Sequence, residues 1–162
     1  MKTLIIIRHA KSNQSFFGND FERPLNDRGR EDAPVMAKRL LQKQSHIDAF
    51  FSSPAKRAKK TAELFAREYG LAADDITLLS SLYHAEAAVF HEVVASIPGH
   101  INSAAIFSHN PGITYFVNEL TDTTRLDNMP TCGIFAVRAD TGTWSSFDKA
   151  KKEFLFFDCP KL

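Results

Sequence analysis

Short apolar runs alternate along this chain with longer segments in which apolar residues recur at helical spacing. The first run, TLIII at residues 3–7, is apolar throughout, which is typical of a strand covered on both faces. Three more strands are predicted from similar runs, at residues 47–53, 76–82 and 103–108. Helices are predicted between and after these strands, at about 27–44, 54–69, 86–97 and from Pro111, at the first helical position, onward.

Prolines and glycines set the expected helix boundaries. Pro34 falls inside the first predicted helix, so this helix either starts late, near Asp32, or bends at the proline. Ser53 and Pro54 predict an N-cap followed by proline at the first position of the second helix. Gly70 is expected to end that helix, since glycine readily adopts the left-handed conformation found after helix C-termini.

The pattern changes near the C-terminus, where apolar runs follow one another without a helical segment. CGIFAVRAD, TWSSF and EFLFFD, at 132–140, 143–147 and 153–158, predict successive strands of antiparallel character. Together with the preceding alternation of strands and helices, they predict an α/β fold. We expect a three-layer αβα sandwich with a mostly parallel central sheet and an antiparallel C-terminal strand. The expected domain is 1–162, with the FLFF segment in its core; a dimer surface is the alternative for FLFF.

Composition narrows the class of protein without indicating a reaction. The 162 residues, 44% hydrophobic and 24% charged, are typical of a globular domain. Because the net charge is only +1, bulk charge does not indicate a nucleic-acid partner. Cys132 and Cys159 match no close-spaced metal pattern, and no apolar run approaches the roughly 20 residues of a membrane helix. We therefore expect a reduced, cytoplasmic protein with no membrane segment.

Four side chains suited to phosphate chemistry fall just beyond predicted strand ends. Arg8 and His9 follow the first strand. Arg57 lies near the start of the helix after the second strand, and His109 follows the fourth. Ligands of open α/β sheets bind beyond the carboxyl ends of the strands, so we expect these four residues to meet at one site.

Each of these residues also has a purely structural interpretation. His9 and His109 are each explained as histidines that hydrogen-bond locally, and Arg57 belongs to the basic run AKRAKKTA, typical of a solvated helix face. However, cations near a helix N-terminus oppose the helix dipole, which favours an anion nearby. The coincidence of two histidines and two arginines at strand ends favours a joint function.

Together, these residue types indicate phosphoryl transfer. Arginine binds phosphate through two parallel hydrogen bonds, and a histidine imidazole can attack phosphorus to form a covalent intermediate. The reaction then depends mainly on positioning and on stabilising charge at the phosphoryl oxygens. Because side chains supply the positive charge, we expect neither a metal ion nor another cofactor.

The motifs around these residues resemble those of the histidine phosphatase superfamily, the phosphoglycerate-mutase-like group. RHA after the first strand is similar to the family's RHG, and RPLNDRGREDA to its R-x-L-T-x-x-G-x-x-Q-A segment. SSPAKRAKKTAE is similar to S-S-P-x-x-R-A-x-x-T-A, and FSHNPG to a G-H-x-P turn. The resemblance spans residues 3 to about 116. It implies that His9 is the phosphorylated nucleophile, that Arg8 and Arg57 bind the phosphoryl oxygens, and that His109 completes the pocket.

The resemblance also implies substrate-binding residues near the nucleophile. In this family a small polar residue a few positions later touches phosphate, and Ser12 or Asn13 matches it here. Arg23 and Asn26, in the RPLN loop, are expected at the rim of the site.

Two positions depart from the family pattern. Ala10 replaces the glycine that follows the nucleophile, a small change that we expect to be tolerated. Many members carry a catalytic glutamate shortly after the third strand, where this chain reads SSLYHAEAAVF. The candidate proton donors there are His84 and Glu86, although Glu86 is better explained as a residue that favours the dipole of the following helix.

The lack of an evident carboxylic acid favours a leaving group that needs little protonation. Phosphohistidine expels an imidazole, with a pKa of about 6.5, whereas an alkyl phosphate must expel an alkoxide. Together with the short chain and the absence of a lid insertion, this is similar to the SixA-like branch. The resemblance implies a phosphatase for phosphohistidine on a signalling protein, such as a histidine phosphotransfer domain. The alternatives are a phosphatase or mutase for a small phosphate ester and a phosphate-binding module with little turnover.

Overall fold

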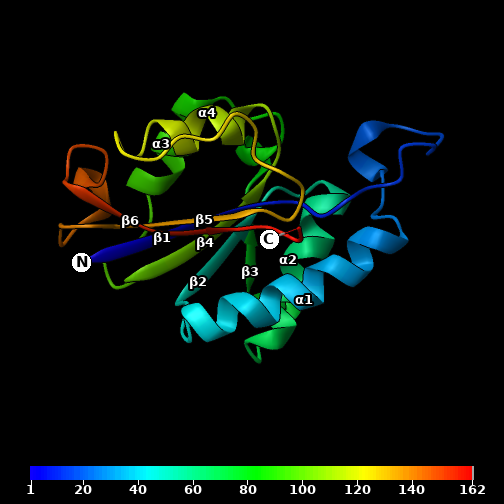
Figure 1. The fold of residues 1–162 in the computed structure, drawn as a ribbon, viewed down its shortest axis with the longest axis horizontal. Coiled ribbons are helices and arrows are strands. Elements are labelled where there is room, and N and C mark those ends of the chain that lie inside the picture. The colour runs from blue at the N-terminus through cyan, green and yellow to red at the C-terminus, as the bar shows by residue number, and fades with distance from the viewer. Residues whose placement is uncertain (162) are drawn as a thin grey trace.

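The computed structural model describes residues 1–161, which contain a six-stranded sheet with helices on both faces (Figure 1). Residue 162, the last of the predicted domain, lies outside the described residues. The strands are β1 (Lys2–Arg8), β2 (Ala49–Ser52), β3 (Ile76–Leu78), β4 (Ser103–Ser108), β5 (Ile134–Ala139) and β6 (Lys152–Asp158). The helices are α1 (Asp27–Lys43), α2 (Lys56–Glu68), α3 (Ala87–Ala95) and α4 (Gly112–Asn118).

The sheet has the strand order β3-β2-β4-β1-β5-β6. β1 pairs in parallel with β4 and antiparallel with β5. β2 pairs in parallel with both β3 and β4, and β6 pairs antiparallel with β5 at the edge. Only β5 therefore runs opposite to the other described strands. The predicted three-layer αβα sandwich with a mostly parallel sheet is confirmed.

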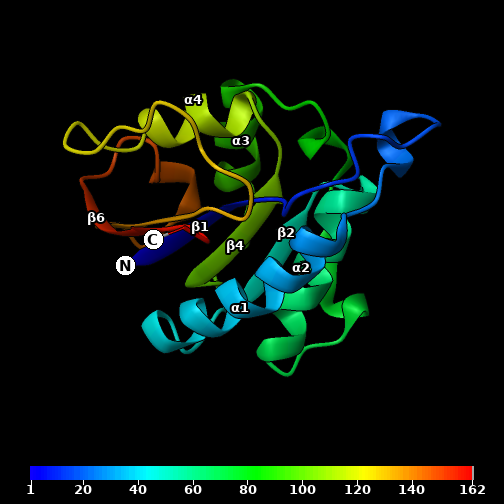
Figure 2. The same ribbon diagram turned by 45° about the vertical axis from the view of Figure 1, so that its right-hand side comes forward.

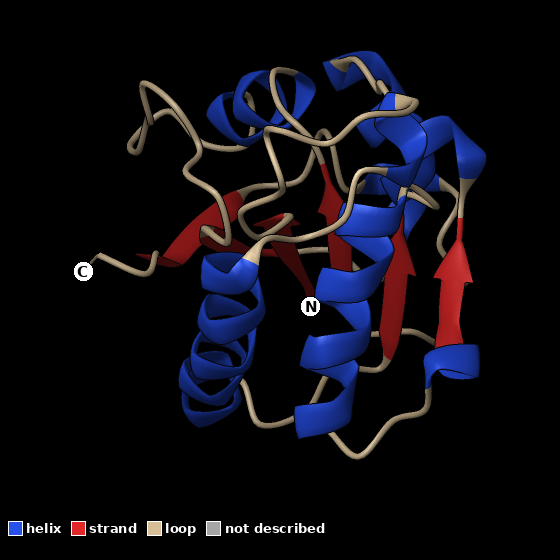
Figure 3. Ribbon diagram, turned by 90° about the vertical axis from the view of Figure 1, so that its right-hand side faces the viewer, coloured by secondary structure: helices blue, strands red, loops and turns tan. Residues whose placement is uncertain are grey.

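Helices cover both faces of the sheet, which explains the continuous apolar run in β1. Figures 1 and 3 show α1 and α2 side by side on one face, while α3 and α4 cover the other. Leu4 and Ile6 belong to the core under α3 and α4. Ile5 and Ile7 belong to the core under α1 and α2. Successive side chains of a strand point to opposite faces, so a strand buried on both sides needs apolar residues at every position.

The first helix is continuous across its proline. α1 begins at Asp27 and includes Pro34, so the alternative of a late start near Asp32 is wrong. Asn26 caps the helix, because its side-chain oxygen accepts a hydrogen bond from the Gly29 N–H at 2.8 Å. This cap stabilises the N-terminal turn ahead of the proline.

The predicted start of the second helix is wrong. α2 begins at Lys56, so Pro54 precedes the helix instead of occupying its first position. Ser53 is not the N-cap, because its hydroxyl oxygen accepts from the Ala55 N–H at 3.2 Å and so stabilises the turn before the helix. The expected end is confirmed: the helix stops at Glu68, and Gly70 has a φ of 73°.

Three other predicted elements differ from the structure. Pro111 is the N-cap of α4 and not its first helical residue. The strand predicted at 76–82 ends at Leu78, because its partner β2 ends at Ser52; a 3₁₀ turn follows. Residues 144–146 form a 3₁₀ helix and not a strand, because the buried Trp144 indole donates to the Ile101 carbonyl at 2.7 Å.

The FLFF segment lies in the edge strand β6 and contributes to both cores. Phe154 and Phe157 pack against the core under α3 and α4. Leu155 and Phe156 pack against the other core. All four are half-buried, in agreement with the expected core position.

No helix within residues 1–161 is long and apolar enough to cross a membrane.

Gly29 fixes the distance between α1 and the segment after β1. A Cβ atom at Gly29 would lie 2.1 Å from the Lys11 carbonyl oxygen, closer than atoms can approach. We therefore expect Gly29→Ala to lower the free energy of unfolding by about 1–3 kcal/mol, as overpacking does. Urea denaturation measures this change. Gly99→Ala is the matched control, because a Cβ atom there meets no atom within 4 Å; equal stability of the two variants would contradict the prediction.

Candidate active site

The parallel strands bring the predicted residues together at their carboxyl ends. Arg8 ends β1, and His9 follows it; His109 follows β4, and Arg57 lies in the first turn of α2, after β2. These four residues line one pocket of about 490 Å³. The other lining residues are Lys11, Ser12, Gln14, Arg23, Asn26, Asn110 and Thr131. The segment between β1 and α1 stands out from the body beside this edge of the sheet (Figure 2).

His9 is buried, and its imidazole ring is held in a fixed orientation. Its Nδ1 atom lies 2.7 Å from the Ala10 carbonyl oxygen, which can only accept a hydrogen bond. The ring proton is therefore on Nδ1, and Nε2 keeps its lone pair. Burial, together with the nearby cations Arg8 and Arg57, lowers the pKa of His9 to about 3. Near pH 7 the imidazole is thus unprotonated and can act as a nucleophile.

His109 lies against His9, with 5.2 Å between the ring centroids. Its Nε2 atom lies 2.7 Å from the Ser53 hydroxyl, which also accepts from the Ala55 N–H. A hydroxyl that donates to Nε2 leaves the ring proton on Nδ1. This Nδ1 is buried and has no hydrogen-bond partner within the described residues, so it is a free donor beside His9. Burial and the neighbouring His9 lower the pKa of His109.

The two predicted arginines are held in place by backbone carbonyls. Arg8 Nη1 donates to the Met129 carbonyl at 2.8 Å. Arg57 Nη1 donates to the Asp20 carbonyl at 2.7 Å, and its side chain is only 5% exposed. Burial, followed by repulsion from Arg57 and Arg23, lowers the pKa of Arg8. Guanidinium groups gathered around one pocket, with Arg57 buried and Arg8 partly buried, are an anion-binding arrangement.

Of the predicted substrate-binding residues, Ser12 and Arg23 line the pocket and Asn13 does not. Arg23 Nη1 donates to the Ser12 hydroxyl. Asn13 instead stabilises its own turn, because its side-chain oxygen accepts from the Ser15 N–H at 3.0 Å. The structure therefore favours Ser12 over Asn13. Asn26 also lines the pocket and donates to the Ser12 carbonyl at 3.3 Å.

The candidate proton donors lie in an adjoining pocket of about 600 Å³. His84 and Glu86 line this second pocket, which shares His109 and Asn110 with the first. Both side chains are exposed, and Glu86 is the N-cap residue of α3. Neither residue lines the pocket of His9, so both border the site from the adjoining pocket.

Three residues at the site were missed by the sequence analysis as functional candidates. Asp20 hydrogen-bonds to Arg57, Ser53 hydrogen-bonds to His109, and Thr61 accepts from the Ala10 N–H at 3.0 Å. Ser53 and Thr61 belong to the S-S-P-x-x-R-A-x-x-T-A motif, so the motif itself was a signal for them. For Asp20 the signal is its spacing of three residues from Arg23, which matches an ion pair within a turn.

Within residues 1–161, no cluster of three or more histidine, cysteine, aspartate or glutamate side chains is arranged to hold a metal ion.

The two buried histidines make stability depend on pH. In the unfolded chain a histidine binds a proton near pH 6.5, whereas folded His9 does so only near pH 3. The unfolded state therefore binds more protons between these values, and the free energy of unfolding falls as the pH is lowered from 7 to 5. Urea denaturation at the two pH values measures this fall. We expect a smaller fall for His9→Asn and an unchanged fall for His100→Asn, an exposed control. Equal wild-type stability at pH 5 and 7 would contradict the prediction.

Comparisons with known proteins agree on the fold and find a family similarity in the first half of the chain. Residues 4–83 match the model of the histidine phosphatase superfamily (branch 1). A SixA protein from Agrobacterium tumefaciens, assigned as a phosphohistidine phosphatase, has a TM-score of 0.83 at 22% identity, with 98% of each chain covered. The protein histidine phosphatase SixA in complex with tungstate gives the same TM-score and identity, covering 98% of this chain and 97% of that one.

A curated relative adds a match in sequence. An uncharacterized protein of Picosynechococcus sp. is 33% identical over 64 residues, which are 39% of this chain and 39% of that protein. The shared fold is that of an α/β protein with a mostly parallel sheet and a pocket at the strand ends. Residues 4–83 are thus similar to the histidine phosphatase superfamily, and the whole described chain shares the fold of the solved SixA structures.

Proposed function

We propose that this protein is a phosphatase that acts through a phosphorylated His9 and removes the phosphoryl group from phosphohistidine on another protein. The observation that carries the proposal is the position of His9. Its imidazole is neutral, with Nε2 free, and it lies against His109 in a pocket lined by Arg8 and Arg57.

The first half of the reaction transfers the phosphoryl group to the enzyme. Nε2 of His9 attacks phosphorus, and the bond between phosphorus and the substrate nitrogen breaks. The electron pair of that bond stays with the departing imidazole, which takes up a proton from water. Meanwhile the guanidinium groups of Arg8 and Arg57 and the Nδ1–H of His109 stabilise negative charge on the phosphoryl oxygens.

The second half regenerates the nucleophile. A water molecule attacks phosphorus, and the bond between phosphorus and His9 Nε2 breaks. Inorganic phosphate leaves, a proton is released to solvent, and His9 returns to its neutral form. No residue has to protonate an alkoxide in either half, which suits a site whose carboxylate Glu86 lies outside the pocket of His9.

Similarity to SixA supports this choice of substrate. The solved structures with this fold include proteins described as phosphohistidine phosphatases, one of them with a bound tungstate, an oxyanion that resembles phosphate. For this chain we propose the same substrate class, with a histidine phosphotransfer domain as the expected partner.

A substrate panel tests the proposed function. Wild-type protein is incubated with a phosphorylated histidine phosphotransfer domain, with several sugar phosphates and with p-nitrophenyl phosphate. We expect kcat/KM to be highest for the phosphorylated domain. A higher value for a sugar phosphate would overturn the substrate class, and no turnover of any substrate would favour a phosphate-binding module.

The adjoining pocket supports a second candidate function, hydrolysis or transfer of a small phosphate ester. His84 and Glu86 border His109 from that pocket and could protonate an alkoxide held there. If this candidate is correct, Glu86→Gln or His84→Gln lowers the turnover of a phosphate ester. Unchanged turnover of every active substrate in both variants would eliminate it.

The proposed mechanism draws its positive charge from arginine side chains. We therefore expect an excess of EDTA over the protein to leave kcat/KM unchanged. The measurement is phosphate release before and after dialysis against the chelator. Reversible loss of activity that is restored by a divalent cation would show that the metal-free mechanism is wrong.

A further inference from the structure

Asp20 contacts more charged groups of the site than any residue singled out from the sequence. Its Oδ2 atom accepts hydrogen bonds from Arg57 Nη2 at 2.9 Å and from the Tyr83 hydroxyl at 2.7 Å. Its Oδ1 atom accepts from Arg23 Nη2 at 3.0 Å. Its backbone carbonyl accepts from Arg57 Nη1 at 2.7 Å. Asp20 thus accepts hydrogen bonds from both terminal nitrogens of Arg57 and also from a second arginine, Arg23.

The chain around Asp20 is built to hold it in this position. Asp20 begins a short 3₁₀ helix, Asp20–Glu22, in which the Asn19 side chain caps the Glu22 N–H at 3.2 Å. The Phe21 ring packs edge-on against Tyr83, with 5.2 Å between the centroids. These contacts join the projecting segment between β1 and α1 to the body of the protein beside the pocket.

The contacts leave part of the Arg57 guanidinium available. An arginine carries five N–H hydrogens, and Asp20 accepts two of them, one on each terminal nitrogen. The side chain also lines the pocket, and its Nε is buried with no hydrogen-bond partner among the described residues. Asp20 therefore holds the Arg57 guanidinium through two N–H groups and leaves its other three N–H groups free of Asp20.

The charges around the pocket require such a residue. Arg8, Arg23 and Arg57 lie close enough for the last two to lower the pKa of Arg8. Like charges so close push the side chains apart unless a negative charge holds them. Partial burial opposes ionisation of Asp20, but the hydrogen bonds from Tyr83, Arg23 and Arg57 outweigh it and lower the pKa of Asp20. Its carboxylate is therefore negative at neutral pH.

We propose that Asp20 is a positioning residue, which holds the guanidinium of Arg57 in the orientation that binds the transferred phosphoryl group. It acts through Arg57 and not by contact with the substrate. The kinetic consequence rests on the proposed phosphatase function, whereas the effect on the motion of Arg57 does not.

The kinetic test is a double-mutant cycle with the phosphorylated histidine phosphotransfer domain as substrate. Asp20→Asn keeps the shape of the side chain but removes its charge and one acceptor. We expect it to lower kcat/KM at least tenfold in the wild-type background and less than twofold in Arg57→Ala. Since Asp20 acts through Arg57, its loss has no effect once Arg57 is absent. Equal losses in the two backgrounds would overturn the proposal, because a merely structural role is additive.

The second test needs no enzymatic activity. Proton exchange of the Arg57 Nε–H with solvent is measured by NMR in the wild type and in Asp20→Asn. We expect exchange at least tenfold faster in the variant, because the guanidinium loses its carboxylate anchor. Unchanged exchange would overturn the proposal even if the kinetics agree. If the wild type proves inactive on every phosphorylated substrate, the proposed function fails, and this measurement still decides the role of Asp20.

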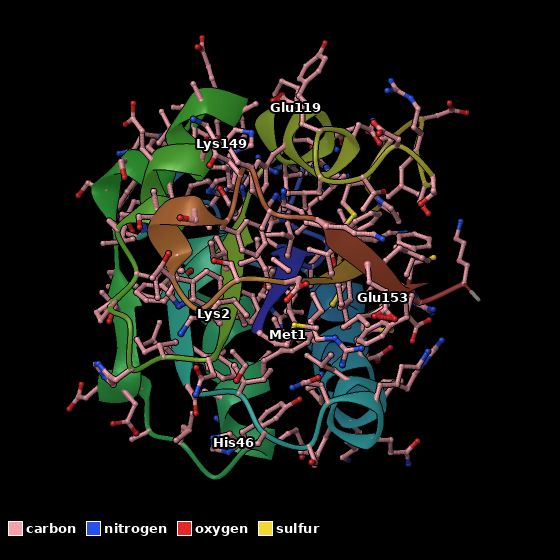
Figure 4. All side chains as sticks on the ribbon, turned by 90° about the vertical axis from the view of Figure 1, so that its left-hand side faces the viewer. Met1, Lys2, His46, Glu119, Lys149 and Glu153 are labelled. Atoms are coloured by element: carbon pink, nitrogen blue, oxygen red, sulfur yellow. The ribbon has the colours of Figure 1, made fainter. Side chains whose placement is uncertain are left out.

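Two further variants complete the design. Glu153→Gln is the matched control, because Glu153 pairs with Arg138 at 2.8 Å between β6 and β5, and neither residue lines the pocket. Glu153 is labelled in Figure 4, which views the molecule from the end where β1 begins. We expect this control to change neither measurement.

Tyr83→Phe removes one hydrogen bond to Asp20 and replaces Asp20→Asn in the kinetic test if Asp20→Asn does not fold. We expect a two- to fivefold loss of kcat/KM that is absent in Arg57→Ala, and loss of the same size in both backgrounds would overturn the proposal.

Discussion

His9→Ala lowers kcat for phosphohistidine hydrolysis by a factor on the order of 10⁴ or more, the scale seen when a covalent nucleophile is removed. The cause is the loss of Nε2, the atom that receives the phosphoryl group. The variant also fails to form a phosphorylated protein. Rapid quenching after mixing with a ³²P-labelled phosphodonor domain measures both results, since a phosphohistidine adduct survives alkaline but not acid conditions.

His100→Ala is the control for this experiment, because His100 is an exposed histidine outside the pocket. It is expected to form the adduct and to turn over at the wild-type rate. A labelled adduct that persists in His9→Ala would place the nucleophile elsewhere. Turnover that persists without any adduct would indicate direct attack by water and would sink the covalent mechanism.

Arg57→Ala has the second largest expected effect. Loss of one preorganised donor to a developing negative charge costs about 2.7–4 kcal/mol of transition-state stabilisation, which corresponds to roughly 10²–10³ in kcat. Arg57 is almost fully buried at the pocket wall, so water cannot replace its hydrogen bonds well. Steady-state kinetics with the phosphorylated domain measures the loss.

A second substitution, Arg57→Lys, separates the effect of the positive charge from the effect of the planar guanidinium group. Arg57→Lys keeps the charge but not the planar fork, so we expect it to recover only a small part of the lost activity. Arg67→Ala, at an exposed arginine of the same helix, serves as the control and should retain wild-type kcat. Full recovery by lysine would mean that charge alone matters at this position.

The sequence predicted most of the fold because buried parallel strands have a strong pattern. A strand covered on both faces must be apolar at every position, and β1 and β4 are of this kind. The errors fall where a tertiary contact overrides the local pattern. Residues 143–147 were predicted as a strand, but the indole of Trp144 is buried and donates to the Ile101 carbonyl, and residues 144–146 form a 3₁₀ helix. Ser53 reads as a helix cap, but it serves the turn before α2.

The candidate site was predictable only in part for a related reason. The position of His9, Arg57 and His109 follows from the ends of parallel strands, a rule that sequence order already contains. The contact between Asp20 and Arg57 joins residues 37 positions apart, and Asp20 lies in the irregular segment between β1 and α1, at the start of a single 3₁₀ turn. No periodicity constrains where a loop carries its side chains, so nothing in the sequence indicated this contact. The choice between Ser12 and Asn13 likewise depended on a local turn.

β1 lies in the interior of the sheet, hydrogen-bonded to β4 on one side and β5 on the other. Amides in such a strand exchange with deuterium only when the whole molecule unfolds, whereas a projecting loop exchanges through small local openings. The strand that carries Arg8 and precedes His9 is therefore expected to be among the last parts of the protein to open, and the segment that holds Asp20 to open earlier. One wall of the pocket thus rests on the most protected part of the sheet, whereas the other depends on the side-chain contacts that join the Asp20 segment to Arg57 and Tyr83.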